Sequence, residues 1–122
     1  MPSETRAAEV SGQPSGWDSV EVEVDRVIAE SADPFDPDTI ANAHDLLMVG
    51  RNGCPVPTSA AKGYWATVSF SWSNFEIEVF EDRLEVYHFF DKKTDISYEE
   101  HRPGETFTPR FLAERAALSI TA

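Results

Sequence analysis

The most constraining feature of this sequence is a change in hydrophobic period near Trp65. Before this residue, apolar side chains recur every three or four positions, and after it they alternate with polar ones. This alternation predicts three strands, over residues 65–72, 75–79 and 84–90. The apolar residues of these strands share one face, so the sheet needs a second layer to cover it.

Short polar segments separate the predicted strands. Ser73-Asn74 and Glu81-Asp82 are typical of tight turns between antiparallel strands. Asp91-Lys92-Lys93 predicts a third turn, which leaves residues 96–99 as a short edge strand. The sequence therefore predicts an antiparallel meander of three or four strands.

The segment over residues 20–31 has two possible structures. Val20, Val24, Val27 and Ile28 lie on one face of a helix, whereas Val20, Val22 and Val24 also alternate as in a strand. The helix also accounts for Val27 and Ile28, and we therefore favour it.

Two further helices carry start signals. Asp36 followed by Pro37 predicts a helix whose apolar stripe is Ile40, Ala43, Leu46 and Leu47, with Gly50 as the C′ residue. Residues 51–63 are expected to form a loop. Thr108-Pro109 repeats the start signal before a short helix over residues 110–119.

These elements predict an α+β fold, in which two N-terminal helices pack on one face of a 3–4-stranded antiparallel meander and a short helix closes the chain. Residues 1–16, with Gly12, Pro14 and Gly16, are expected to form a flexible arm, and residues 17–122 a single domain.

Composition limits the classes of function. The chain has 122 residues, 22 of them acidic and 10 basic, for a net charge of −12. This acidity opposes binding to nucleic acid or to an anionic membrane. No apolar stretch approaches the length of a membrane span, and the N-terminus lacks the apolar run of a signal peptide. We therefore expect a cytoplasmic protein.

No catalytic constellation is recognisable. Cys54 is the only thiol, and His44 is the nearest candidate base in sequence, so a small thiol-dependent or hydrolase-like enzyme is one hypothesis. Glu76, Glu78 and Glu85 are expected to share a solvated sheet face with serine and threonine. The sequence predicts no catalytic, cofactor-binding or metal-binding residues.

The acidic residues favour a different class, a non-enzymatic module that binds a basic protein, such as an inhibitor or antitoxin-like protein of bacteria or phage. A third hypothesis is a homo-oligomer that forms through the edge strand or through exposed aromatic residues. The expected contact residues lie on the first helix and on the polar sheet face: Glu21, Glu23, Asp25, Glu30, Glu76, Glu78, Phe80, Glu85, Tyr87 and Phe89.

About half of the chain resembles a group of small uncharacterised bacterial α+β proteins. The motifs that carry the resemblance are Asp36-Pro37-Asp38-Thr39-Ile40, Pro55-Val56-Pro57, Val68-Ser69-Phe70-Ser71-Trp72 and Glu76-Ile77-Glu78-Val79. Members usually have a glycine in the second strand turn, where this chain has Glu81-Asp82. The resemblance implies a helix that leads through a proline loop into a β-meander, and it implies no active site.

Overall fold

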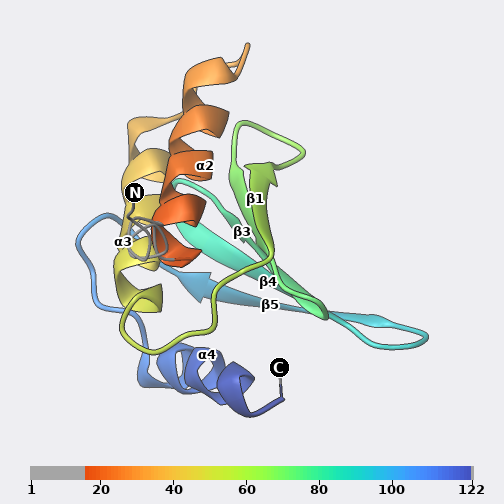
Figure 1. The fold of residues 1–122 in the computed structure, drawn as a ribbon. Helices are drawn as coiled ribbons and strands as arrows, with labels where there is room; N and C mark the ends of the chain where they lie inside the picture. The colour runs from red at the N-terminus through yellow and green to blue at the C-terminus, as the bar shows by residue number, and fades with distance from the viewer. Residues whose placement is uncertain (1–15, 122) are drawn as a thin grey trace, which may run out of the picture.

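The computed structural model describes residues 16–121, with side chains described through residue 115, and has an α+β fold. Within these residues three helices accompany one antiparallel sheet of five strands in the order β1-β2-β3-β4-β5 (Figure 1). The elements are α2 (Gly16–Glu30), α3 (Pro37–Gly50), β1 (Ser59–Lys62), β2 (Val68–Ser71), β3 (Phe75–Val79), β4 (Arg83–Phe89), β5 (Thr94–Glu100) and α4 (Pro109–Thr121).

The first element is a helix, as its longer apolar stripe predicts. Val20 and Val24 are buried in the core, whereas Val22 is exposed to solvent. In a strand these three alternating residues would all lie on the same face. The predicted arm over residues 1–16 lies outside the described residues except for Gly16, which is the first residue of α2.

Helix α3 begins as predicted but ends differently. The Asp36 side chain accepts a hydrogen bond from the Asp38 backbone N–H at 2.8 Å, and Pro37 is the first helical residue. The prediction that Gly50 is the C′ residue is wrong, because Gly50 is the last residue of the helix and Arg51 is the C-cap.

The sheet has more strands than the sequence predicts. The loop expected over residues 51–63 contains the edge strand β1. The strand expected over residues 65–72 is limited to Val68–Ser71. The short edge strand expected over residues 96–99 is the seven-residue strand β5. The two short turns are confirmed by backbone hydrogen bonds from Trp72 to Phe75 and from Phe80 to Arg83.

The core lies between the sheet and the helices. In Figure 1, α2 and α3 lie on one side of the sheet, with α2 in contact with β1 and β2, and α3 in contact with β2 and β3. The buried apolar side chains of β2, β3 and β4 face this layer: Val68, Phe70, Phe75, Ile77, Val79, Leu84 and Val86. Helix α4 adds Phe111 to the same core and begins at the predicted Thr108 cap.

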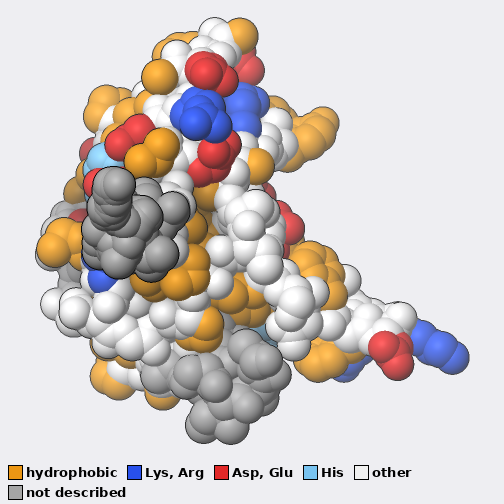
Figure 2. Space-filling model, in the orientation of Figure 1, with side chains coloured by type: hydrophobic (Ala, Val, Ile, Leu, Met, Phe, Trp, Pro, Cys, Tyr) orange, Lys and Arg blue, Asp and Glu red, His pale blue; other side chains and the backbone are white. Residues whose placement is uncertain are grey.

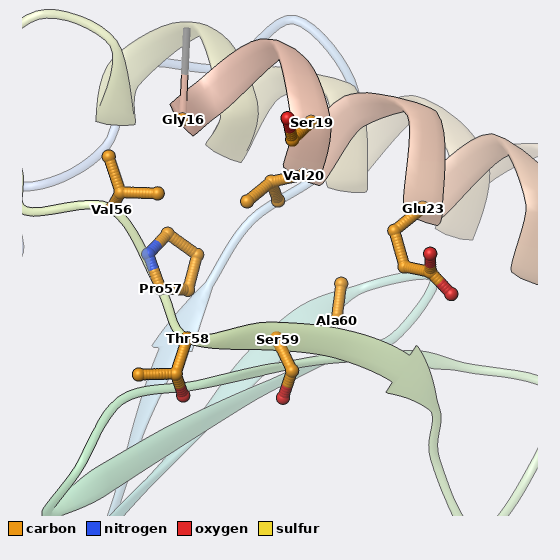
Figure 3. A pocket seen from close by; sticks show the side chains of 9 residues that line it. All are labelled: Gly16, Ser19, Val20, Glu23, Val56, Pro57, Thr58, Ser59 and Ala60. Carbon is orange, nitrogen blue, oxygen red and sulfur yellow. The ribbon is translucent and has the colours of Figure 1, made fainter. Parts of the chain in front are cut away.

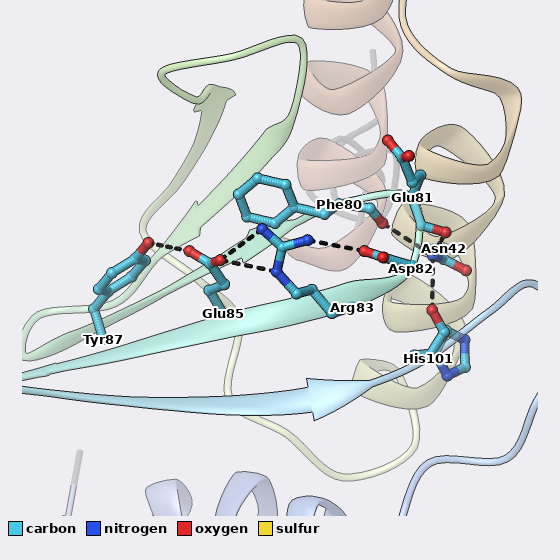
Figure 4. Close-up of polar contacts among 8 residues, drawn as sticks. All are labelled: Asn42, Phe80, Glu81, Asp82, Arg83, Glu85, Tyr87 and His101. Atoms are coloured by element: carbon cyan, nitrogen blue, oxygen red, sulfur yellow. Dashed lines mark hydrogen bonds and ion pairs between the residues drawn. The ribbon is translucent and has the colours of Figure 1, made fainter.

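One buried amide joins α3 to the sheet. Asn42 is fully buried, and its Nδ2 donates to the backbone oxygens of Phe80, Glu81 and His101 at 3.0, 3.1 and 3.2 Å (Figure 4). The buried His101 ring in turn lies 2.9 Å from Asp45 of α3. Together these contacts attach the β3–β4 turn and the end of β5 to the middle of α3.

Candidate functional site

The sheet face opposite the helices carries most of the polar strand residues. Alternation along β2, β3 and β4 places Thr67, Ser69, Glu76, Glu78, Arg83, Glu85 and Tyr87 on this side, and we call these residues the acidic face. No helix among the described residues covers the acidic face in Figure 1. In Figure 2 the molecule is hollowed on this side, between the β1–β2 turn and the β4–β5 hairpin.

The strand register lines up the carboxylates of the acidic face. Glu78 lies directly opposite Glu85, with Ser69 on the other side of Glu78. Glu76 lies opposite Tyr87 in the neighbouring row. Two carboxylates that face each other across a strand pair repel, so other groups must compensate them.

Neutral hydroxyl groups stabilise two of these carboxylates. The Thr67 hydroxyl donates to Glu78 at 2.5 Å, and the Ser69 hydroxyl donates to Glu76 at 2.7 Å. Among the described residues no Lys, Arg or His forms an ion pair with either carboxylate. The expectation of a fully solvated face is wrong for Glu78, which is 7% exposed because Gly63 of the β1–β2 turn lies against its carboxylate.

The third carboxylate has a cationic partner (Figure 4). Glu85 accepts hydrogen bonds from Arg83 Nε at 2.9 Å and from the Tyr87 hydroxyl at 2.5 Å. Burial raises the pKa of the Tyr87 phenol, and its hydrogen bond to Glu85 raises this pKa further. Tyr87 is therefore a neutral hydrogen-bond donor that fixes Glu85, and it is not available as a base near neutral pH.

The aromatic residues expected as a contact patch have different environments. Phe89 is exposed, as predicted. Phe80 is only partly exposed, because the Arg83 guanidinium lies 4.1 Å from the centre of its ring. Tyr87 is also partly exposed and is held by its hydrogen bond. The predicted patch is therefore reduced to Phe89.

Sequence reasoning missed the aromatic residues that border the acidic face. Tyr64 and Trp65 lie in the β1–β2 turn, beside the glycine that contacts Glu78, and Trp65 is 64% exposed. On the other side, Tyr98 of β5 lies opposite Glu85 and is 57% exposed. Exposed aromatic side chains around a polar centre are typical of a protein-interaction surface.

The acidic residues of α2 form a second candidate surface, and most of them have partners within the chain. Arg51 binds Asp18 at 2.7 Å and Glu21 at 2.5 Å. Arg26 lies 2.9 Å from Glu23. These ion pairs neutralise part of the charge expected to attract a partner, and the His44 imidazole lies 3.4 Å from Asp25. Glu30 is an exposed carboxylate at the end of the same helix.

Cys54 and His44 are not in contact in the structure. The His44 imidazole lies beside Asp25, whereas Cys54 is half-buried, and its carbonyl accepts a hydrogen bond from the Trp17 indole at 3.2 Å. Burial raises the pKa of the Cys54 thiol, and the opposing effect of the nearby Arg115 guanidinium is smaller. This environment favours the thiol over the reactive thiolate.

The raised pKa of Cys54 has a measurable consequence. At pH 8 we expect iodoacetamide to alkylate folded Cys54 at least about threefold more slowly than an unfolded control of the same chain in urea, because thiolate is the reacting species. The rate should rise with pH beyond the point at which the unfolded control levels off. Faster alkylation of the folded chain at pH 8 would contradict this account and support the thiol-enzyme hypothesis.

Concave regions also lie elsewhere in the described part of the chain, and one of about 260 Å³ is lined by Asp82, Arg83, Glu100, His101, Arg102 and Glu105. A cleft of about 450 Å³ lies between α2 and β1, and its polar lining residues are Ser19, Glu23, Thr58 and Ser59 (Figure 3). Within residues 16–121 no group of three or more His, Cys, Asp or Glu side chains is placed to hold a metal ion. No helix in this part of the chain is long and apolar enough to cross a membrane.

The acidic face therefore combines carboxylates, fixed hydrogen-bond donors and bordering aromatic rings on a rigid sheet. Its geometry suits recognition of a cationic group, since two of its carboxylates have only neutral partners among the described residues. In comparisons with protein-family models, with curated proteins and with solved structures, nothing matches this chain.

Proposed function

We propose that this chain is a non-enzymatic protein-interaction module whose acidic face binds an arginine-rich segment of another protein. The observation that carries the proposal is the carboxylate pair Glu76 and Glu78, whose partners among the described residues are hydroxyl groups. Glu76 is partly exposed and can contact a guanidinium, whereas Glu78 is only 7% exposed and adds its negative charge beside it. A module of this kind could inhibit a basic protein by occupying the segment that the basic protein needs for its own function.

The chemistry of the site favours arginine over lysine. A guanidinium can bind a carboxylate through two parallel hydrogen bonds and can stack on an aromatic ring at the same time. Tyr98 of β5 lies opposite Glu85, and Trp65 lies in the β1–β2 turn two residues after Gly63, which contacts Glu78; both aromatic side chains are exposed. The ammonium group of lysine is a more strongly hydrated point charge, so lysine gains less from this combination.

The net charge of −12 supports the proposal through long-range attraction. This attraction acts on any cationic partner, so it increases the association rate without selecting a site. The test must therefore separate binding at the acidic face from attraction to the whole chain.

A hexa-arginine peptide and two charge-matched variants separate these contributions. Glu76→Gln with Glu78→Gln removes two charges from the acidic face, and each glutamine oxygen can still accept the serine or threonine hydroxyl. Glu23→Gln with Glu30→Gln removes two charges from α2. By isothermal titration calorimetry we expect the first pair to weaken binding about tenfold and the second less than about twofold.

Three further results bear on the proposal. A hexa-lysine peptide should bind several-fold more weakly than hexa-arginine, and Trp65→Ala should reduce this difference. Binding should weaken as the salt concentration rises. Equal losses from the two variant pairs would show that net charge alone attracts the peptide, and would remove the acidic face as the site.

A further inference from the structure

Strand β5 has one edge that no described residue covers. In the part of the chain that the structure describes it pairs only with β4, and its sequence from Thr94 to Glu100 contains neither proline nor glycine. In Figure 1 the β4–β5 hairpin projects away from the helices. Edges of this kind are usually protected by lysine, proline, a bulge or a covering element, because they can pair with another strand.

The hydrogen bonds at the two ends of β5 show which residues face its free edge. The backbone N–H of Phe90 bonds to Lys93, and that of His101 bonds to Asp82. Along an antiparallel ladder, residue pairs that exchange backbone hydrogen bonds alternate with pairs that do not. Every second residue of β5 therefore bonds to β4, and the residues between them point their N–H and C=O groups toward the free edge. These residues are Thr94, Ile96, Tyr98 and Glu100.

The side chains of these residues are compatible with a strand partner. Ile96 is 51% exposed and Tyr98 is 57% exposed, so the centre of the edge is apolar. Of the residues whose backbone groups face the free edge, only Glu100 is charged and it lies at one end of the strand, while Lys92 lies in the hairpin turn at the other end. The two ends of the edge therefore carry opposite charges. When the edges of two copies lie antiparallel, the positive end of each faces the negative end of the other.

The register of such a pair follows from its charges. If Ser97 faced its counterpart, Asp95 would face Glu99 of the second copy, which is a like-charge contact. If Ile96 faces its counterpart, Asp95 faces a serine, Thr94 faces a tyrosine and Lys92 faces Glu100 of the second copy. The second register brings opposite charges together at both ends of the pair.

We propose that two copies of the chain form a two-fold symmetric dimer through antiparallel β5–β5 pairing centred on Ile96. The two five-stranded sheets then form one continuous sheet. Pairing uses the backbone groups of the free edge and leaves the acidic face open, so the dimer does not depend on the proposed binding of an arginine-rich segment.

Disulfide trapping tests both the dimer and its register. In a Cys54→Ser background, Ile96→Cys places two thiols in a hydrogen-bonded pair with Cα atoms about 5.5 Å apart, within the range for a disulfide. Tyr98→Cys is the matched control, because it lies on the same exposed edge but about 13 Å from its counterpart in this register. In a glutathione redox buffer we expect mainly disulfide-linked dimer for Ile96→Cys and mainly monomer for Tyr98→Cys.

Charge exchange gives an independent result. Lys92→Glu and Glu100→Lys should each raise the dimer dissociation constant by about tenfold, measured by sedimentation equilibrium, because each change creates two like-charge contacts. The double variant should restore the wild-type constant. Thermal denaturation checks each variant for its own stability, since Glu100 also lies opposite Arg83 in the same chain.

Three outcomes would overturn the dimer or its register. A wild-type chain that stays monomeric at several hundred micromolar would exclude the dimer. Equal cross-linking at both cysteine positions, or a double variant as weak as the single ones, would exclude this register. None of these outcomes affects binding of hexa-arginine, so failure of the dimer and failure of the proposed function can be told apart.

Discussion

Replacing Asn42 with alanine is expected to lower the free energy of unfolding by about 3 kcal/mol, measured by urea denaturation. The Asn42 amide is fully buried, and it donates to three backbone oxygens of the β3–β4 turn and the end of β5. Without this amide, those carbonyl groups lose their donor, and the His101 carbonyl loses it in a fully buried site. Each such loss costs about 1–3 kcal/mol, and partial relaxation keeps the total near the lower end of the sum.

Two variants make this prediction specific. Asn42→Asp keeps the size of the side chain but places a carboxylate against carbonyl oxygens, so we expect a larger loss that becomes smaller at acidic pH, where the carboxyl group regains a proton to donate. Asn52→Ala is the control, because the Asn52 amide donates to Met48 on the exposed surface. That change should cost less than about 0.5 kcal/mol. A loss below 1 kcal/mol for Asn42→Ala would contradict the proposed role of the amide.

The sequence gives no indication of this role for Asn42. Asn42 lies between alanines on a clearly predicted helix, where a polar residue would ordinarily face solvent. Its acceptors are 38, 39 and 59 residues away in the chain. Hydrophobic period reports which face of an element is buried, but it does not report which polar group of another element meets that face.

Local chemistry explains which elements could be predicted. Helix α3 carries its own N-cap and proline, and β3 and β4 carry strict alternation with polar turn residues between them. By contrast, β1 reads Ser59-Ala60-Ala61-Lys62, with no β-branched residue and only Ala60 buried. It is a strand because β2 offers it a free edge, and no pattern within those four residues shows this.

The same distinction applies to the candidate site. Alternation places Glu76, Glu78 and Glu85 on one face, as the sequence predicts. The burial of Glu78 depends on the path of the β1–β2 turn, and on Gly63 in particular, where a side chain would overlap the Glu78 carboxylate. Two adjacent aromatic residues where the predicted loop meets the first predicted strand, Tyr64 and Trp65, were the available signal for the border of the site.

Gly50→Ala is expected to lower the free energy of unfolding by about 2 kcal/mol, although glycine to alanine within a helix ordinarily stabilises by roughly 0.5–1 kcal/mol. Gly50 is helical, and a β-carbon at this position would overlap the outer ring of the Trp17 indole. The indole is buried and is held by its hydrogen bond to the Cys54 carbonyl, so it has little room to move away.

A double-mutant cycle with Trp17→Phe identifies the reason for this glycine. Trp17→Phe removes the outer ring that the new β-carbon would meet, so Gly50→Ala should become neutral or stabilising in that background, as judged by urea denaturation. If instead Gly50 were needed for a left-handed backbone at the end of the helix, alanine would destabilise equally in both backgrounds. The glycine is therefore required by the close approach of α2 to α3, and a coupling energy of about 2 kcal/mol in this cycle would measure that contact.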